Sequence, residues 1–269
     1  YTYPKNGIPY ANDPPIQDYE ILRSLEPVDV SSHPRMKVFE EEAKVLSSEA
    51  KNIVPVSASI GGPFTIASIL RGVERLLRDC RKYPQEIHRL MRIITDSQKN
   101  YIDIAAKYGV EVDMADPVAN PALIGPKMYK EFVYPYTKEL TDYGFQKTGY
   151  KVSLHMCGNT YSIWKYLGDY QLNELSLDNI IDLKRAAAEI GSHVPIAGNV
   201  DPVNIVMNGT REEIFLDVQK CIDEGRHAEK GYTLATGCDI PETTDPQKVE
   251  WFMDAARAYG EYTEYRKIK

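Results

Sequence analysis

Two apolar segments of the chain end in residues that bind transition metals. His155 and Cys157 lie at the end of the run at 150–156, and Cys238 ends a similar run that begins at Tyr232. Side chains alternate along a β-strand, so His155 and Cys157 point to one face and can bind the same ion. One imidazole and two thiolates leave a fourth coordination position open, which is the pattern of a catalytic zinc. The three residues therefore predict a zinc site that can also bind a substrate.

The elements needed to position these residues are strands followed by helices. Strand-like runs alternate with amphipathic helical runs along the chain, which predicts a parallel α/β fold. An eight-unit (β/α) barrel carries its catalytic groups where strands end, as the three candidate ligands do here. The strand-like runs are 53–59, 110–116, 151–156, 172–177, 194–200 and 232–238, and the helical runs are 64–78, 85–108, 128–145, 183–190, 211–223 and 249–259.

Six βα units are two fewer than a closed eight-stranded barrel needs, and an open doubly wound sheet is the alternative. The chain also opens at Tyr1 in a turn-rich segment without an initiator Met. We therefore expect residues 1–269 to form a single (β/α) barrel domain that is N-terminally incomplete. The chain is then the C-terminal portion of a longer chain, or another chain supplies the remaining units. Residues 1–34 contain several prolines and little periodicity, which predicts a loop-rich excursion.

Composition and charge exclude several other classes of protein. The chain has 269 residues with 43% hydrophobic content, enough for one large α/β domain. Its net charge of −7 and its lack of Lys/Arg clusters argue against a nucleic-acid partner. No run reaches the roughly 18 to 20 apolar residues of a membrane span, and no signal-peptide pattern occurs at the start. Four scattered cysteines do not form a disulfide framework. We predict a cytoplasmic protein with reduced thiols and neither a nucleic-acid nor a membrane partner.

Several further segments resemble one protein family. They are Gly-Pro-Phe-Thr-Ile-Ala at 62–67, the pair of runs at 116–121 and 131–136, Gly-Asn-Val-Asp-Pro at 198–202, and Thr-Gly-Cys-Asp-Ile-Pro at 236–241. These runs are similar to signatures of the uroporphyrinogen decarboxylase superfamily, and the resemblance extends from about residue 53 to 259. His155-x-Cys157-Gly158, together with Gly237-Cys238, resembles its branch of zinc- and corrinoid-dependent methyltransferases of the methylcobamide:coenzyme M type. The resemblance implies a (β/α)8 TIM barrel.

The same resemblance implies an activity. In this branch a thiol bound to Zn²⁺ is deprotonated and takes a methyl group from the cobalt of a corrinoid, a chemistry that zinc supports near neutral pH. The implied co-substrate is a methylcobamide carried by a corrinoid partner protein. The methyl acceptor or donor is a small thiol such as coenzyme M or a methylated small molecule, with the direction of transfer left open. His155, Cys157 and Cys238 are the implied catalytic residues.

Four polar residues at the ends of other strands are further candidates. Asp178 resembles an acidic residue that lies near the metal in these methyltransferases, and it is either a fourth zinc ligand or a contact to His155. The remaining three can line the substrate pocket, or can serve as caps and turn formers before prolines. These substrate-binding candidates are Asp116, Asn199 and Asp201.

Two other functions stay open. A metal-free decarboxylase, like uroporphyrinogen decarboxylase itself, has a histidine where this chain has Cys238, and it predicts a pocket lined by arginines. A non-catalytic member of the family is favoured by the count of six βα units. Taken alone, a His-x-Cys pair on a strand is more often a packed thiol beside a hydrogen-bonded imidazole than a metal site.

Overall fold

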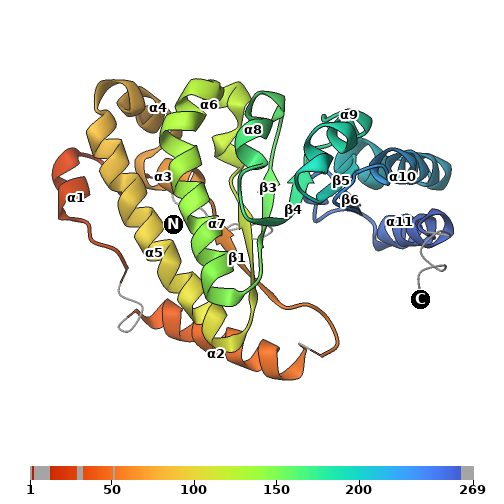
Figure 1. The fold of residues 1–269 in the computed structure, drawn as a ribbon, viewed down its shortest axis with the longest axis horizontal. Helices are drawn as coiled ribbons and strands as arrows, with labels where there is room; N and C mark the ends of the chain where they lie inside the picture. Colours follow the sequence, from red (N-terminus) through yellow and green to blue (C-terminus); the bar gives the residue numbers. More distant parts are fainter. Residues whose placement is uncertain (1, 3–12, 29–32, 51, 262–269) are drawn as a thin grey trace. The chain divides into compact units, whose positions relative to one another are not determined.

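The computed structural model describes residues 2, 13–28, 33–50 and 52–261. Within this part of the chain six strands follow in the sheet order β1-β2-β3-β4-β5-β6, and each strand is followed by at least one helix (Figure 1). The strands are β1 (Ser57–Gly61), β2 (Glu111–Ala115), β3 (Val152–Met156), β4 (Leu172–Leu177), β5 (Ile196–Val200) and β6 (Tyr232–Thr236). The parallel α/β order with six βα units is therefore confirmed.

The helices include two short π-helical segments, η2 and η5, which follow α6 and β5. The α-helices are α1 (Tyr19–Ser24), α2 (Pro34–Glu49), α3 (Pro63–Arg71), α4 (Val73–Lys82), α5 (Pro84–Tyr108), α6 (Pro121–Met128), α7 (Tyr134–Thr148), α8 (Trp164–Leu167), α9 (Leu183–Ala188), α10 (Arg211–Gly225) and α11 (Pro246–Tyr259). The π segments are η2 (Tyr129–Val133) and η5 (Pro202–Met207), and the 3-10 segments are η1 (Pro117–Ala119), η3 (Tyr161–Ile163) and η4 (Ile190–Ser192). None of the helices in the described ranges has the length and apolar character that crossing a membrane requires.

The chain divides into two compact units, and the first consists of Tyr1–Leu154 with Asp169–Gln171. Strands β1 and β2 pair in parallel here, with Ala58 opposite Val112. The long helix α5 lies beside α7 (Figure 1) and presents one apolar face to the core, as the helical period requires. The largest fully buried side chains of this unit include Phe64, Leu76, Ile87, Leu90, Met91, Ile102, Tyr129 and Phe132.

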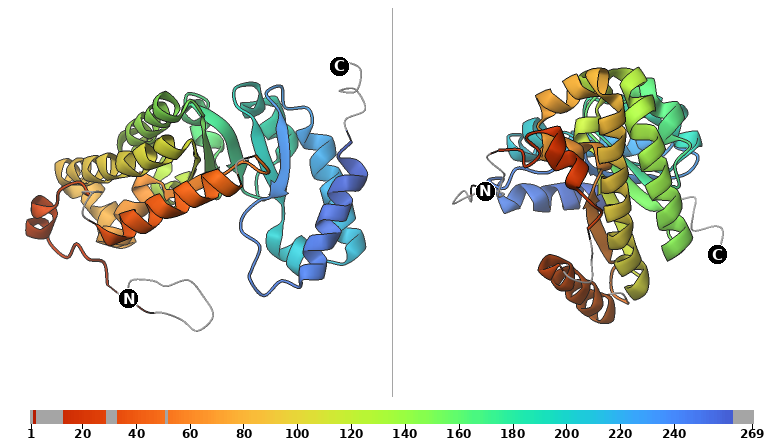
Figure 2. Two further views of the ribbon diagram at one scale, coloured as in Figure 1. Left: turned by 90° about the horizontal axis from the view of Figure 1, so that it is seen from below. Right: turned by 90° about the vertical axis from the view of Figure 1, so that its left-hand side faces the viewer.

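The second unit consists of His155–Gly168 with Leu172–Lys269. Its strands β4, β5 and β6 pair in parallel, with Ile196 of β5 opposite both Leu175 and Tyr232. All five residues of β5 are buried, as expected for a parallel strand that is covered on both faces. Helices α9 and α10 pack on β5, and α10 lies beside α11 (Figure 2). A capping box between Thr210 and Glu213 begins α10.

Several element boundaries differ from the prediction. The helix expected at 64–78 is divided into α3 and α4 by Gly72, whose φ of 84° breaks the helical path. The strand expected at 53–59 begins at Ser57, because Pro55 has no N–H to donate to a strand partner. Helices α1, α2, α6 and α8 were not predicted, although α2 and α6 begin with a proline in the first turn, a common start signal.

Part of the loop-rich excursion predicted for residues 1–34 falls on residues 1, 3–12 and 29–32, outside the described residues. The remainder contains α1, which Asp18 caps by accepting a hydrogen bond from Ile21 N. Arg71 donates to the carbonyl oxygens of Ile16 and Gln17 at 2.9 and 2.8 Å, and pairs with the buried Asp79 at 2.9 Å. These bonds attach this stretch to α3 and α4.

Candidate metal centre

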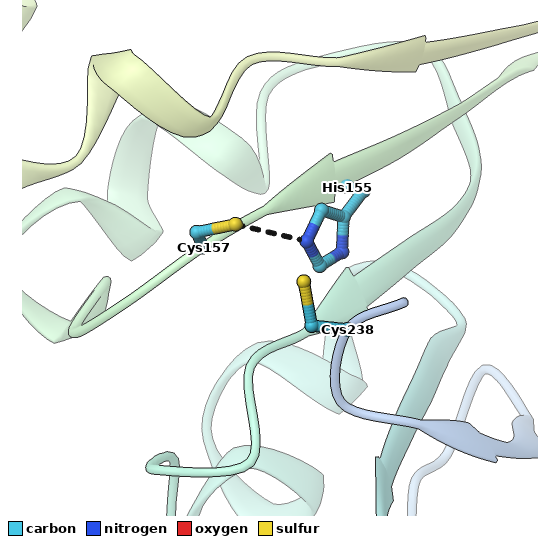
Figure 3. Close-up of side chains that lie close together, drawn as sticks. All are labelled: His155, Cys157 and Cys238. Atoms are coloured by element: carbon cyan, nitrogen blue, oxygen red, sulfur yellow. Dashed lines mark hydrogen bonds between the residues drawn. The ribbon is translucent and has the colours of Figure 1, made fainter. Parts of the chain in front are cut away.

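The ends of β3 and β6 bring the three predicted ligands together. His155 is the penultimate residue of β3, Cys157 follows the strand, and Cys238 lies two residues beyond β6. One ligand atom from each side chain lies within 4.8 Å of the other two. Figure 3 shows both thiols directed towards the imidazole ring. Strand alternation accounts for the His155–Cys157 pair, whereas the approach of Cys238 depends on strand order.

The orientation of His155 directs one ring nitrogen towards a second candidate ligand and the other towards a serine. Its Nδ1 lies 2.9 Å from the hydroxyl oxygen of Ser176 on β4, and its Nε2 lies 3.2 Å from Sγ of Cys157. A metal-binding histidine commonly uses one nitrogen as ligand while the other donates to a protein oxygen. Ser176 was not predicted. The available signal was strand alternation, because Ser176 lies on β4 two residues before Asp178, which directly follows the strand.

Burial and nearby negative charge define the electrostatics of the three ligands. Burial lowers the pKa of His155, which favours the neutral imidazole, although Asp178 and Asp239 act in the opposite direction. Burial, with smaller contributions from Cys238, Asp178 and Asp239, raises the pKa of Cys157 to about 12. The Cys157 thiol therefore stays protonated near neutral pH unless a cation supplies positive charge. A bound divalent cation satisfies that requirement.

The donor set and its spacing fit zinc. Bonds of about 2.0 Å to nitrogen and about 2.3 Å to sulfur place the ligand atoms of a tetrahedral zinc roughly 3.5–3.8 Å apart. The distance from His155 Nε2 to Cys157 Sγ, 3.2 Å, is a few tenths of an ångström shorter, and the whole group lies within 4.8 Å. Thiolate and imidazole ligands together select zinc over magnesium or calcium, which prefer oxygen.

Asp178 lies beside the three ligands but its carboxylate oxygens already have partners. Oδ2 accepts a hydrogen bond of 2.7 Å from Gly158 N, and Oδ1 accepts one of 3.0 Å from Ile180 N. The group of ligand atoms within 4.8 Å contains His155, Cys157 and Cys238 only, among the residues that the structure describes. The nitrogen of His155 that a carboxylate would contact is taken by Ser176.

Asn199 and Asp201, at the end of β5, serve as turn formers. The amide nitrogen of Asn199 donates to the carbonyl oxygens of Asp178 and Ile181 at 3.0 and 2.7 Å. Asp201 caps η5 by accepting from Val203 N and Asn204 N. Both residues also line a cavity of about 510 Å³ between α9 and α10. Their role in substrate binding stays a prediction.

Asp116 belongs to the first unit, where it caps α3. It is completely buried and accepts hydrogen bonds from Thr65 N at 2.8 Å, Thr65 Oγ1 at 2.6 Å and Phe64 N at 3.4 Å. Burial raises the pKa of Asp116 to about 6, against the effect of these hydrogen bonds. A Cβ atom on Gly62 would lie 2.2 Å from this side chain, so a glycine is needed at the start of α3. A substrate-binding role for Asp116 stays a prediction.

Comparison with known protein families identifies the family of this chain. A family model described as uroporphyrinogen decarboxylase (URO-D) matches residues 1–259. The chain belongs to the uroporphyrinogen decarboxylase family. This membership confirms the resemblance that the sequence motifs indicated.

Relatives within this family include both methyltransferases and decarboxylases. A methylcobamide:CoM methyltransferase of Methanosarcina acetivorans is 26% identical over 226 residues, covering 84% of this chain and 64% of the relative. A uroporphyrinogen decarboxylase of Hordeum vulgare is 26% identical over 221 residues, covering 79% of this chain and 65% of the relative. The chain thus spans less than two thirds of the length of these relatives.

A solved structure shows the fold that this family member adopts. A methyltransferase from Methanosarcina mazei matches with a TM-score of 0.78 at 24% identity, covering 95% of this chain and 72% of that protein. Together with family membership, this likeness confirms the predicted fold class, an α/β fold of the uroporphyrinogen decarboxylase barrel type.

Proposed function

We propose that this member of the uroporphyrinogen decarboxylase family takes part in zinc-dependent methyl transfer between a corrinoid and a small thiol. The observation that carries the proposal is the convergence of His155, Cys157 and Cys238 within 4.8 Å. The comparisons support it, because relatives at 26–27% identity are named as methylcobamide:CoM methyltransferases. Another relative is named as a methylated-thiol–coenzyme M methyltransferase.

The three ligands have distinct roles in this proposal. His155 provides a neutral nitrogen whose direction is held by Ser176. Cys157 and Cys238 provide soft sulfur donors, which raise electron density at the metal and keep a substrate sulfur nucleophilic. Zinc, when bound, supplies the positive charge that keeps these thiols and a coordinated substrate thiol deprotonated near neutral pH. Three protein ligands leave one coordination position for that substrate.

The proposed reaction moves the methyl group without its bonding electrons. A sulfur–carbon bond forms as the methyl–cobalt bond breaks, and both electrons of the broken bond remain with the cobamide. The proton of the thiol is released before the transfer. The proposed partners are therefore a corrinoid protein and a small thiol such as coenzyme M, or a methylated compound when transfer runs in the other direction. A cytoplasmic location and the absence of a nucleic-acid partner remain predictions from the sequence.

The metal content of the purified protein tests the proposal. We expect near-stoichiometric zinc by plasma mass spectrometry in protein prepared without chelator. Replacing one of three ligands leaves too few donors to hold the ion, so His155→Ala and Cys238→Ala should lose most of it. Two matched controls should keep the wild-type content. These are Cys80→Ala, which removes a buried thiol of α4, and His227→Ala, which removes an exposed histidine.

Incubation with methylcobalamin and coenzyme M then tests the activity itself. Wild-type protein with zinc should change the cobalamin absorption spectrum as the methyl group leaves cobalt, and the two ligand variants should not. Wild-type protein that neither contains zinc nor takes it up would refute the proposal. That result would favour the metal-free decarboxylase, which the relationship to the Hordeum vulgare enzyme also supports.

A further inference from the structure

One four-residue turn lies against both cysteine-bearing segments of the candidate metal centre. It comprises residues 178–181, between β4 and α9, and we call it the β4–α9 turn. Gly158, Gly237, Asn199 and Asp201, which contact this turn, all belong to the second unit.

On one side the turn holds the backbone that follows Cys157. Oδ2 of Asp178 accepts the N–H of Gly158 at 2.7 Å. Gly158 has a φ of 75°, a conformation that glycine adopts without strain and that turns the chain directly after Cys157. The direction in which the Cys157 side chain leaves the backbone therefore depends on this bond.

On the other side the turn packs against the backbone that precedes Cys238. A Cβ atom built on Gly237 would lie 2.3 Å from the backbone nitrogen of Asn179 and 2.7 Å from its Cβ. These separations are far below ordinary contact distances, so the two backbones are as close as a glycine permits. Asn179 thus limits how closely Cys238 can approach from β6.

Hydrogen bonds from the end of β5 hold the β4–α9 turn in place. Asn199, which is 6% exposed, donates to the carbonyl oxygens of Asp178 and Ile181. Asn179 Nδ2 donates to Asp201 Oδ2 at 3.1 Å. Within the turn, Ile180 N donates to Asp178 Oδ1 at 3.0 Å. A short turn with this many internal and external hydrogen bonds has little freedom to move.

We propose that the β4–α9 turn is a spacer that sets the separation of the two cysteines, with Asp178 and Asn179 as positioning residues. Asp178 acts through its two hydrogen bonds to backbone N–H groups and not as a zinc ligand. Rotation of its carboxylate towards a metal would leave the partly buried N–H of Gly158 without its acceptor, which is unfavourable. The relevance of the spacer to methyl transfer rests on the proposed function. The effect of the turn on the separation of the two cysteines does not depend on that function.

Two variants perturb the spacer from its opposite sides. Asp178→Asn keeps the size of the side chain but replaces one acceptor oxygen by an N–H₂ group, which cannot accept from a backbone N–H. Gly237→Ala inserts a methyl group where Asn179 now lies. The matched control is Asp182→Asn in the adjacent residue, because Asp182 caps α9 through Arg185 N and Asn is an equally good cap.

The first measurement uses metal-free protein and reports the separation of the thiols. Oxidation with diamide joins Sγ of Cys157 to Sγ of Cys238, and the two protons and two electrons released reduce the diazene to a hydrazine. Peptide mass spectrometry follows the yield of this disulfide with time. We expect rapid formation in wild type and in Asp182→Asn, and formation at least tenfold slower in Asp178→Asn and Gly237→Ala.

The second measurement is the affinity for zinc, obtained by competition with a chromophoric chelator. Loss of a residue that orients a metal ligand typically weakens binding 10- to 100-fold, and we expect a loss of that size in both variants. The Co²⁺-substituted forms should keep the thiolate charge-transfer absorption of wild type, because no ligand is removed. Circular dichroism checks folding, and Gly237→Ala provides the test if Asp178→Asn does not fold.

The outcomes separate this inference from the proposed function. Unchanged disulfide formation in both variants would overturn the spacer. A changed Co²⁺ spectrum in Asp178→Asn, with disulfide formation as in wild type, would show Asp178 to be a ligand and would also overturn it. Slow disulfide formation in the variants, combined with wild-type protein that binds no zinc, would support the spacer while refuting the proposed function.

Discussion

Replacing Asp116 by asparagine should change how the stability of the protein depends on pH. Asp116 is completely buried at the start of α3, and its pKa is raised from an ordinary value of 3.8 to about 6. The folded protein therefore holds a proton on this carboxyl more tightly than the unfolded chain does. Below about pH 4 this effect stabilises the fold in full, and the free energy of unfolding then falls as pH rises through about 6.

The size of the effect follows from the shift. A pKa difference of about 2 units at about 1.4 kcal/mol per unit corresponds to roughly 3 kcal/mol. Ionisation of Asp116 therefore lowers the free energy of unfolding by this amount as the pH rises from about 4 to 7. Asn does not titrate, so Asp116→Asn lacks this contribution. Its amide offers one acceptor oxygen for the N–H groups of Phe64 and Thr65, so we also expect a loss of about 1–3 kcal/mol that is independent of pH.

Urea denaturation at several pH values between 4 and 7 measures both quantities. The difference in unfolding free energy between wild type and Asp116→Asn should be largest near pH 4 and should shrink by about 3 kcal/mol towards pH 7. Asp113→Asn, on the strand that Asp116 directly follows, is the control and should keep the wild-type profile because Asp116 is intact. A constant difference between wild type and Asp116→Asn across this range would refute the reasoning.

Two further predictions concern single contacts. Ser176→Ala removes the partner of His155 Nδ1, so the affinity for zinc should fall about 10-fold in chelator competition. Ser176→Thr retains a hydroxyl and should lose less affinity. Equal zinc affinities of wild type and Ser176→Ala would contradict the role of Ser176. Arg71→Leu removes the buried cation that pairs with Asp79 and leaves only the exposed Arg78, at 3.4 Å, beside that carboxylate. Urea denaturation should show a loss of about 3–5 kcal/mol. A loss below about 1 kcal/mol would contradict the importance of the Arg71–Asp79 pair.

Local sequence patterns were sufficient for most strands and for part of the candidate site. The strand at 172–177 was predicted with its observed bounds, because apolar and polar residues alternate from Glu174 to Leu177 and turn residues flank the run. His155 and Cys157 are two residues apart on one strand, so their common direction follows from backbone geometry alone. Boundaries were less accurate where a single residue decides the backbone path, as Gly72 does between α3 and α4.

The sequence alone therefore determined the alternation of strands and helices, the family, and the pairing of His155 with Cys157. Only the tertiary structure decided which residues at other strand ends join them. Asp116, Asn199 and Asp178 all end or follow strands, yet one caps a helix in the first unit, one braces a turn, and one holds Gly158 N. The physical reason is that a strand-end position specifies where a residue lies along the chain, whereas its hydrogen-bond partners come from segments distant in sequence. Those partners become adjacent only when the strands are ordered in the fold.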